Sequence, residues 1–324
     1  MKLSRMLFAG VLLVAASAAQ ADEWPSRPIT LIVPFSAGGG VDLSARIQAQ
    51  RMGELLGQPI VVENVGAAAG MAGSARVAKA DPDGYTMLIG NSGTQAYSQA
   101  LYKTPLYNSL TDFTPVGLAT ESPRILIARK DFPAANLRDF VAYVKANQSQ
   151  MQFGSAGVGS GTHLPCVLLN MAMGVSVTHV PYRGEALAQQ DLIGGRIDYM
   201  CSTIQTGAAL AKQGTVKGLA VMAAHRAKVI PDLIATPEEG LPEASVWNAF
   251  FLPAKAPVAI VQRLNKAMSD ALDDPAIHAR LEELGLEIVV PERRTPDYLA
   301  KFQTEEVARW GKVVHDAGIS ADAQ

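Results

Sequence analysis

The residues that could do chemistry in this chain lie in short loops of Gly, Ala, Ser and Thr, each directly after an apolar segment. In the first half these loops are 35–40, 66–70 and 91–94; in the second half they are 155–163, 182–184 and 202–203. Such loops expose backbone N–H groups at the starts of helices, where anions bind. Any one loop could be an ordinary turn, but the common position after apolar segments favours a shared anion site.

The glycine loops lack the signatures of nucleotide binding and of a serine nucleophile. No Lys follows any of these glycines, so a P-loop is not indicated. The segment "GVGSGT" from Gly157 matches a dinucleotide fingerprint only in part, because Thr162 stands where the third Gly belongs. The residues around Ser36, Ser92 and Ser160 do not fit the G-x-S-x-G pattern of a nucleophile elbow.

Few titratable side chains accompany these loops. His163 opens a helix, where it would cap or pack, and His179 lies inside a strand, where packing is the usual role. Asp42 could cap a helix, or it could receive a ligand amine or hydroxyl or orient a water. Arg183 could meet a carboxylate or lie in solvent at the rim. Paired catalytic carboxylates are absent from the loops, so an enzyme is disfavoured; a carboxylate-processing hydrolase or lyase using His163 and a Ser is the alternative.

Apolar strands and amphipathic helices alternate along the chain, and this alternation must position the loops. The expected strands are 29–35, 59–65, 85–91, 124–128, 151–155, 176–181, 196–201, 216–223, 245–254 and a short one in 286–291. The expected helices are 42–56, one after 66–70, 137–146, 163–173, 185–193, 206–213, 257–284 and 296–317. This rhythm predicts an α/β fold with two doubly wound sheets, and a ligand site beyond the carboxyl ends of the strands.

Two lobes follow from the way the pattern restarts after "DFTPVGLATESP". We expect a discontinuous first domain of residues 22–122 and 247–324, and a second domain of residues 123–246. No low-complexity linker separates the halves, so the crossings between the lobes should be strands. A ligand would then lie between the lobes.

Composition and the N-terminus indicate an exported globular protein. Of the 324 residues 48% are hydrophobic and 18% charged, and a net charge of −2 gives no basic face for nucleic acid. Lys2 and Arg5 precede a short apolar run, and Ala19-Gln20-Ala21 is a cleavage site, so residues 1–21 are expected to be a secretory signal cleaved after Ala21. Its loss leaves 26 basic and 30 acidic residues, a net charge of −4. No later apolar run reaches membrane-spanning length.

Export changes the interpretation of the two cysteines. Cys166 and Cys201 would enter an oxidising compartment, which favours a disulfide over reactive thiols. Two isolated buried thiols are the alternative. Neither has neighbours at metal-ligand spacing, so a zinc site is not expected.

Seven motifs, in matching order over essentially the whole mature chain, resemble the Bug family of extracytoplasmic solute-binding receptors of tripartite tricarboxylate transporters. They are "WPSRPITLIVPFSAGGGVD", "NVGAAAG", "DPDGYTMLIG", "DFTPVGL", "GVGSGTHL", "VTHVPYRG" and "GGRIDYMC". The resemblance implies a two-domain, type II periplasmic-binding-protein fold that closes like a Venus flytrap. It also implies a small organic anion as ligand: a tricarboxylate, a dicarboxylate, an acidic amino acid, nicotinate or an aromatic carboxylate.

The resemblance also implies which residues bind the ligand, with carboxylates held by main-chain amides, hydroxyls and ordered waters. Together with the loop residues Ala68 and Thr203, the candidates are Phe35, Ser36, Ala37, Gly38, Gly39, Asp42, Ser92, Thr94, Ser155, Gly157, Ser160, Thr162, His163, Tyr182 and Arg183. Within the family the cysteine pair implies a disulfide that ties a helix to a strand of the second domain. Phe35 weakly favours an apolar or aromatic ligand body. No Asp or Glu in the second-domain loops offers a site for an ammonium group, so a carboxylate without a required amine is expected.

We therefore expect a periplasmic solute-binding protein, not an enzyme, without cofactor or metal. It would act as a monomer and serve membrane transport subunits. The alternatives are the hydrolase or lyase above and a receptor for a signalling partner. A structural or interaction protein without a closing cleft is a further alternative.

Overall fold

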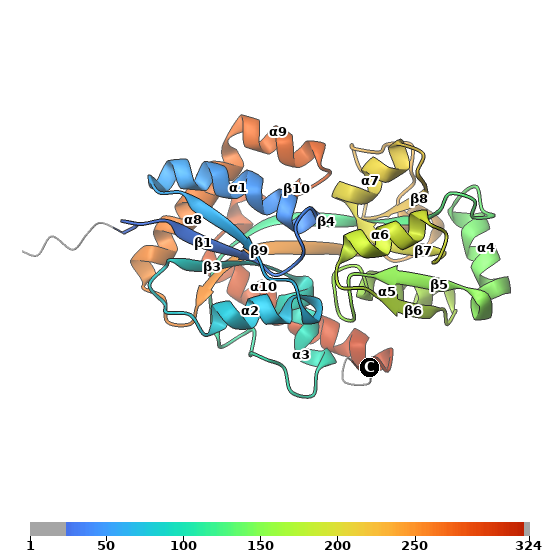
Figure 1. Ribbon diagram of the computed structural model, residues 1–324, viewed down its shortest axis with the longest axis horizontal. Coiled ribbons are helices and arrows are strands. Elements are labelled where there is room, and N and C mark those ends of the chain that lie inside the picture. Colours follow the sequence, from blue (N-terminus) through green and yellow to red (C-terminus); the bar gives the residue numbers. More distant parts are fainter. Residues whose placement is uncertain (1–23, 321–324) are drawn as a thin grey trace, which may run out of the picture.

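The computed structural model describes residues 24–320, which form two lobes side by side (Figure 1). We call the lobe that contains the strands 29–33, 60–64 and 86–91 the first lobe, and the lobe that contains the strands 152–155, 178–181 and 199–203 the second lobe. The predicted secretory signal and its cleavage site lie outside the described residues. In the part of the chain that is described, no helix combines the length and apolarity that a membrane span needs.

The first lobe is a mixed sheet between two layers of helices. Its strands are β1 (Ile29–Val33), β2 (Ile60–Asn64), β3 (Thr86–Asn91), β9 (Ser245–Pro253) and β10 (Glu287–Ile288). β1 pairs in parallel with β2 and β3, and β9 lies antiparallel to β3. One apolar core packs against α1 (Gly40–Leu56), α8 (Val258–Asp273) and α9 (Pro275–Glu283). A second core packs against α2 (Met71–Ala78), α3 (Ser98–Leu101) and α10 (Pro296–Asp316).

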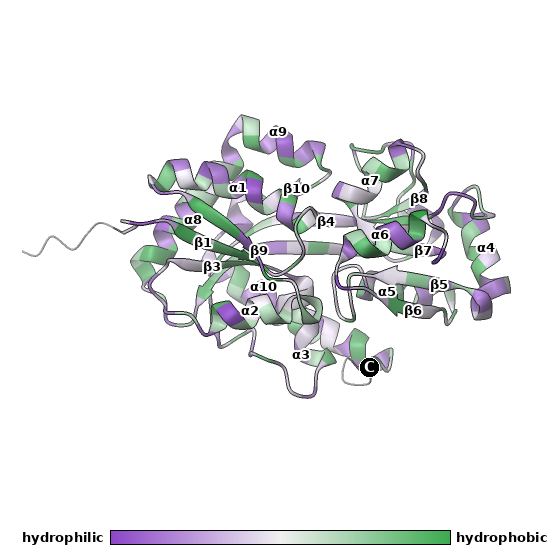
Figure 2. Cartoon of the chain, viewed as in Figure 1, coloured by the Kyte–Doolittle hydropathy of each residue, from purple (hydrophilic) through white to green (hydrophobic). Residues whose placement is uncertain are grey.

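The second lobe repeats this layered plan on a smaller scale. Its strands are β5 (Gln152–Ser155), β6 (Thr178–Pro181), β7 (Tyr199–Thr203) and β8 (Val216–Met222). One core lies under α4 (Leu137–Asn147) and α5 (Leu164–Met173), and the other lies under α6 (Glu185–Ile193) and α7 (Ile204–Lys212). Figure 2 shows hydrophobic colour on inner strands such as β1 and mixed or hydrophilic colour on the outer helices α4 and α9. Burial of this apolar surface drives the layering.

One long strand joins the two lobes. β4 (Phe113–Arg129) pairs with β9 along residues 113–123 and with β7 and β8 along residues 124–129. The two sheets therefore share β4 and form one continuous ladder. The expectation that the crossings are strands is confirmed. The expectation that the strand starts only at residue 124 is wrong, because the register shift after Pro115 lets the ladder continue past that proline.

One other prediction changes in detail. The helix expected over 257–284 is two helices, α8 and α9, which meet at Asp274. Pro275 cannot continue the α8 hydrogen bonds, and the Asp274 side chain accepts from the N–H groups of Ala276 and Ile277, which starts a new helix.

The cysteines form the predicted disulfide. Cys166 on α5 is bonded to Cys201 on β7, with their Cα atoms 5.4 Å apart. The bridge fastens a helix of the second lobe to its central strand. The alternative of two isolated thiols is wrong.

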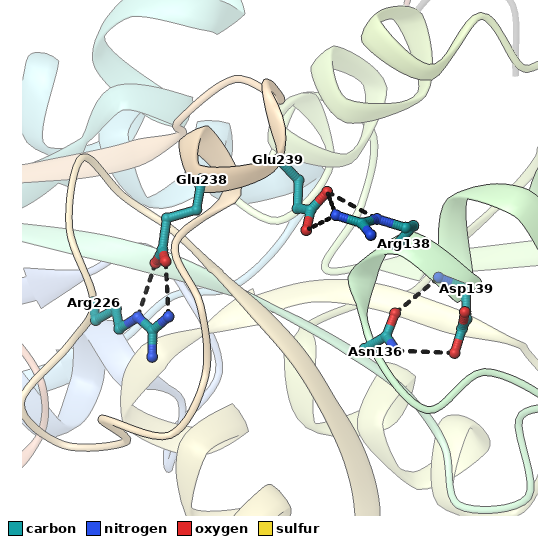
Figure 3. Close-up of polar contacts among 6 residues, drawn as sticks. All are labelled: Asn136, Arg138, Asp139, Arg226, Glu238 and Glu239. Carbon is teal, nitrogen blue, oxygen red and sulfur yellow. Dashed lines mark hydrogen bonds and ion pairs between the residues drawn. The ribbon is translucent and has the colours of Figure 1, made fainter.

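Side-chain pairs fasten the outer parts of the second lobe. Figure 3 shows Arg138 of α4 against Glu239, with nitrogen–oxygen distances of 3.0–3.3 Å, and Arg226 against Glu238. Asn136 caps α4 by accepting from the N–H of Asp139. Glu239 and Glu238 belong to a short 3-10 turn, Thr236–Glu239, so this turn is tied both to α4 and to the loop after β8. The second lobe is thus fixed as a unit away from its boundary with the first lobe.

Candidate functional site

A cavity of about 610 Å³ lies where the loops of the two lobes meet, a volume in the usual range for small-molecule sites. From the first lobe it is lined by Phe35, Ser36, residues 66–70 and Tyr102; from the second lobe it is lined by residues 156–158 and 181–184. These are the loops after β1, β2, β5 and β6. The carboxyl ends of the parallel strands therefore meet at one place, as the sequence predicted.

The two lobes touch beside this cavity. The Ser36 hydroxyl donates to the Arg183 carbonyl over 3.2 Å. The next residue, Gly184, has φ +132°, and a Cβ on it would lie 2.7 Å from Ser36 Oγ. A glycine is therefore required both for the backbone conformation and for the approach of the lobes. This contact closes one side of the cavity.

Asp42 holds the first loop in shape. Its carboxylate accepts from the Gly38 N–H and from Asn64 Nδ2, both over 2.9 Å, and it also accepts from Arg46. Asn64 Nδ2 donates in addition to the carbonyl of Phe35. Burial raises the pKa of Asp42, but the hydrogen bonds from Arg46, Gly38 and Asn64 outweigh it and leave the pKa below its usual value. Asp42 is thus an ionised brace for residues 35–38, already surrounded by donors.

The second loop contains strained backbone. Ala68 and Ala69 have φ +48° and +52°, in the left-handed region that costs a non-glycine residue about 1 kcal/mol or more. Gly70 follows with φ +94°, and a Cβ there would lie 2.7 Å from Thr94 Cγ2. The loop therefore packs closely against the loop after β3 on one side and lines the cavity on the other.

The third loop, after β3, is buried where the lobes approach. Ser92 Oγ accepts from the N–H of Trp247, and the Thr94 N–H donates to the Asn91 side chain. A Cβ on Gly93 would lie 3.2 Å from the carbonyl oxygen of Gly159 in the second lobe. The hydroxyls of this loop hold its own lobe together, and its glycine lets the second lobe come close.

In the second lobe the hydroxyls of the 155–163 loop bond within the loop and to its neighbours. Thr162 Oγ1 accepts from the Ala156 N–H over 2.8 Å and lies 3.1 Å from Ser160 Oγ. Ser155 Oγ lies 3.1 Å from the Gly157 N–H and 2.7 Å from His179 Nε2. These bonds fix the loop around Gly157, which lines the cavity.

The two histidines are packed as a neutral pair. Their rings are stacked 4.0 Å apart, and His163 Nδ1 accepts from the Gly159 N–H. Burial lowers the pKa of His163 to about 3, with a further contribution from His179, and burial lowers the pKa of His179 to about 4. Within residues 24–320 no carboxylate is hydrogen-bonded to His179, so Ser155 and His179 do not form a catalytic triad. Both histidines serve packing.

A smaller cavity of about 40 Å³ shares Phe35 and Ser36 with the larger one and is also lined by a carboxylic residue. It is lined by Phe35, Ser36, Ala37, Gly39, Gly40, Val41, Glu185 and Ala186. Glu185 Oε1 accepts from Ser202 Oγ over 2.6 Å and from the Thr203 N–H over 2.7 Å. Glu185 is the first residue of α6 and not part of the second-lobe loops, so the expectation that those loops offer no ammonium site stays a prediction. The sequence places Glu185 at a helix start, and the fold brings that start to the cleft.

The predicted site residues divide into two groups. Those that line either cavity are Phe35, Ser36, Ala37, Gly39, Ala68, Gly157, Tyr182 and Arg183. Those that line neither cavity are Gly38, Asp42, Ser92, Thr94, Ser155, Ser160, Thr162, His163 and Thr203. Ligand contact by either group stays a prediction. Among the described residues no cluster of three or more His, Cys, Asp or Glu is arranged to hold a metal ion.

A sequence model of the tripartite tricarboxylate transporter family receptor, TctC, matches residues 44–319. The match spans most of the chain, including the loops after β2, β3, β5 and β6. The chain belongs to the TctC receptor family. Proteins of this family are solute-binding receptors and not enzymes, which confirms the sequence prediction.

Three solved structures show the same architecture. The TctC-family chain is similar to MatC (Rpa3494) from Rhodopseudomonas palustris with bound malate, with 40% identity, a TM-score of 0.85 and coverage of 90% of this chain and 100% of that one. It is similar to R. palustris Rpa4515 with adipate, with 33% identity, a TM-score of 0.87 and coverage of 92% and 99%. It is also similar to the periplasmic binding protein BugD, with 35% identity, the same TM-score and the same coverage. The predicted Bug-type fold is thereby confirmed.

Three residues at the boundary of the lobes of this TctC receptor escaped the sequence analysis: Tyr102, Glu185 and Arg124. Tyr102 lines the larger cavity although it lies beyond the third loop. Arg124 had a visible signal, because it is the one charged residue in the apolar run "PRILIA". A charged side chain is rarely fully buried, and the structure buries this one where β4 passes from β9 to β7.

Proposed function

We propose that this receptor captures one small organic carboxylate in the cavity between its lobes and holds it with both. The observation that carries the proposal is the lining of that cavity by the loops of both lobes, with Ser36 and Arg183 in contact at its side. A ligand there would touch four glycine-rich loops at once. It would therefore stabilise the closed arrangement over one in which the lobes are apart.

Several features of the lining support an anion. Arg183 is one of the residues that line the larger cavity, and it carries a positive charge. The loops are built of small residues, so backbone N–H groups can come close to a carboxylate. Similar receptors hold malate and adipate in their solved structures, which supports an aliphatic carboxylate for this chain. Phe35 would cover its carbon skeleton.

The cellular setting follows from the family and the predicted signal. The mature receptor, cleaved after Ala21, works in the periplasm as a monomer and presents its closed form to the membrane subunits of a tripartite tricarboxylate-type transporter. Its first domain comprises residues 22–122 and 247–324, and its second comprises residues 123–246. The change of partner strand along β4 after Pro123 supports that boundary.

A thermal-shift screen of the mature protein tests the proposal. The panel contains tricarboxylates, dicarboxylates, acidic amino acids, nicotinate and benzoate-type acids, and the protein is first unfolded and refolded to remove any co-purified ligand. A ligand at 100 times its dissociation constant should stabilise the fold by about 2.7 kcal/mol. A saturating shift, with one acid bound per chain and recovered unchanged, is the expected result. Silence of the refolded protein across the panel, or conversion of the acid, would contradict the proposal.

A further inference from the structure

The strands that join the lobes have one face toward the ligand loops and one face away from them. β4 and β9 pass between the lobes as a pair, with Glu121 opposite Trp247 (Figure 1). Val246 faces the ligand loops, because its Cγ1 lies 3.2 Å from where a Cβ of Gly161 in the 155–163 loop would be. Side chains alternate along a strand, so Trp247 leaves the opposite face, and Glu121 leaves that face beside it.

A cavity of about 240 Å³, which we call the rear cavity, lies on that opposite face and has one wall from each lobe. Trp247 is part of its lining, together with Phe302 and Trp310 of α10 in the first lobe. The second-lobe wall contains three alanines: Ala223, Ala224 and Ala244. The rear cavity is thus a space that short side chains leave open between the lobes.

Each wall of the rear cavity is held by its own lobe. Glu306 Oε2 accepts hydrogen bonds from Nε1 of Trp247 and Nε1 of Trp310, both over 3.0 Å, and fixes the first-lobe wall. In the second lobe the N–H of Ala244 donates to the carbonyl of Met222 over 3.0 Å. The width of the rear cavity therefore depends on the angle between the lobes and not on movement within a lobe.

Exposed side chains bridge the lobes beside the rear cavity. His225 Nε2 lies 3.4 Å from Glu287 Oε1, and Lys228 Nζ lies 3.0 Å from Glu282 Oε1. The His225 side chain is 70% exposed and that of Lys228 is 87% exposed. Such pairs are weak and their side chains turn readily into solvent, so they permit a closer approach of the two walls.

Opening of the ligand site narrows the rear cavity. Lobes that swing about the strands joining them move in opposite senses on the two faces of those strands. In this structure Ser36 touches Arg183 on the ligand side, so the rear cavity has the width that belongs to the closed arrangement. A rotation that separates Ser36 from Arg183 brings the alanines of the second-lobe wall toward Trp310.

We propose that the rear cavity is a stop for the opening motion, so that the size of the side chains lining it sets how tightly the receptor holds its ligand. The inference rests on the proposed function, because affinity depends on closure only if the ligand binds between the lobes. The short side chains of Ala223 and Ala224 leave the space that opening uses. A larger side chain fills this space and raises the free energy of the open arrangement. More of the ligand-free protein is then closed, and binding tightens in proportion to the closed fraction.

A size series at Ala224 tests the stop without any ligand. Ala224 is exposed at the edge of the rear cavity, so it can be enlarged without disturbing the core. The variants are Ala224→Ser, Ala224→Leu and Ala224→Trp, unfolded and refolded to remove bound acid and measured by small-angle X-ray scattering. The radius of gyration should equal that of the wild type for Ser. It should fall progressively for Leu and Trp toward the value calculated for the closed arrangement.

Ala142→Trp is the matched control for the size series. Ala142 is exposed on α4, away from the boundary between the lobes (Figure 1), so the same enlargement there should leave the radius of gyration unchanged. If Ala224→Leu and Ala224→Trp fold normally by circular dichroism and are no more compact than the wild type, the proposal is overturned.

Affinity gives the second readout, with an acid identified in the thermal-shift screen. Ala224→Trp should lower the dissociation constant by about threefold to tenfold, since a wild type that is about 10% closed without ligand can gain at most about tenfold. The acid should also dissociate more slowly in stopped-flow measurements, because it leaves through the open arrangement. Unchanged or weaker binding by a folded Ala224→Trp would overturn the proposal. A more compact Ala224→Trp that binds no acid of the panel would support the stop and contradict only the proposed ligand.

Discussion

Replacing Asp42 by Ala tests whether this carboxylate braces the first loop or binds the ligand. The side chain is 3% exposed and accepts from the Gly38 N–H, from Asn64 and from Arg46. Asn64 would keep its bond to the Phe35 carbonyl. Arg46 is half exposed and would be solvated, so its pair contributes little. The main loss is the charge-assisted bond to the Gly38 N–H, about 1.5–3 kcal/mol.

Helix α1 adds a smaller contribution, because Asp42 lies in its first turn and an acidic residue there is worth about 0.3–1 kcal/mol. We therefore expect Asp42→Ala to lower the free energy of unfolding by about 2–4 kcal/mol in urea denaturation. The loop would have to be reordered when a ligand binds. Calorimetric titration should then show affinity weakened by about 1–2 kcal/mol.

Glu54→Gln is the matched control for Asp42. Glu54 lies on the same helix, but it is exposed and paired only with Arg51 on its own helix. Its replacement should change the free energy of unfolding by less than about 0.5 kcal/mol. If Asp42→Ala is as mild as this control, the bracing role is refuted. Normal stability with abolished binding would instead show that Asp42 binds the ligand directly.

Three further predictions concern the second lobe and its contact with the first. Replacing Cys166 and Cys201 together by Ala should lower the free energy of unfolding in urea by about 3–4 kcal/mol, because the unfolded chain gains the entropy of the loop that the disulfide closes. A loss below about 1 kcal/mol would contradict this. Burial holds the pKa of His163 at about 3, so as the pH drops the unfolded chain takes up a proton on this histidine before the folded protein does, and the free energy of unfolding should fall between about pH 6.5 and pH 3. His163→Gln should remove about 2 kcal/mol of this loss at pH 5. A profile of stability against pH that the variant leaves unchanged would contradict this prediction. Gly184→Ala should weaken ligand binding at least tenfold, because its methyl group meets Ser36 when the lobes close; unaltered affinity in titration would show that this contact does not matter.

The order of strands and helices could be predicted from the sequence, because it depends on local pattern. Hydrophobic runs located β1, β3 and β7 to within a few residues. The long strand β4 was recognised only in its second part. Its first part contains Pro115 and Pro123, and only pairing with β9, more than a hundred residues later in the chain, makes it a strand.

The candidate site could be predicted as a set of loops but not as a set of contacts. Glycine-rich loops after parallel strands must meet at one edge of a sheet, so the lining by Phe35, Gly157 and Tyr182 was accessible from sequence. The role of Asp42 in holding the first loop could not be predicted, because its hydrogen-bond partner Asn64 lies on the next strand. The burial of Arg124 could not be predicted either, because it depends on the packing of the two lobes around β4.

The most direct test of the account is hydrogen exchange of the mature protein with and without the acid that gives the largest thermal shift. We predict simultaneous protection of loops 35–40 and 66–70 in the first lobe and of loops 155–163 and 181–184 in the second. Protection should spread to both lobes at one bound acid per chain. Protection confined to one lobe, or located away from these four loops, would contradict binding between the lobes.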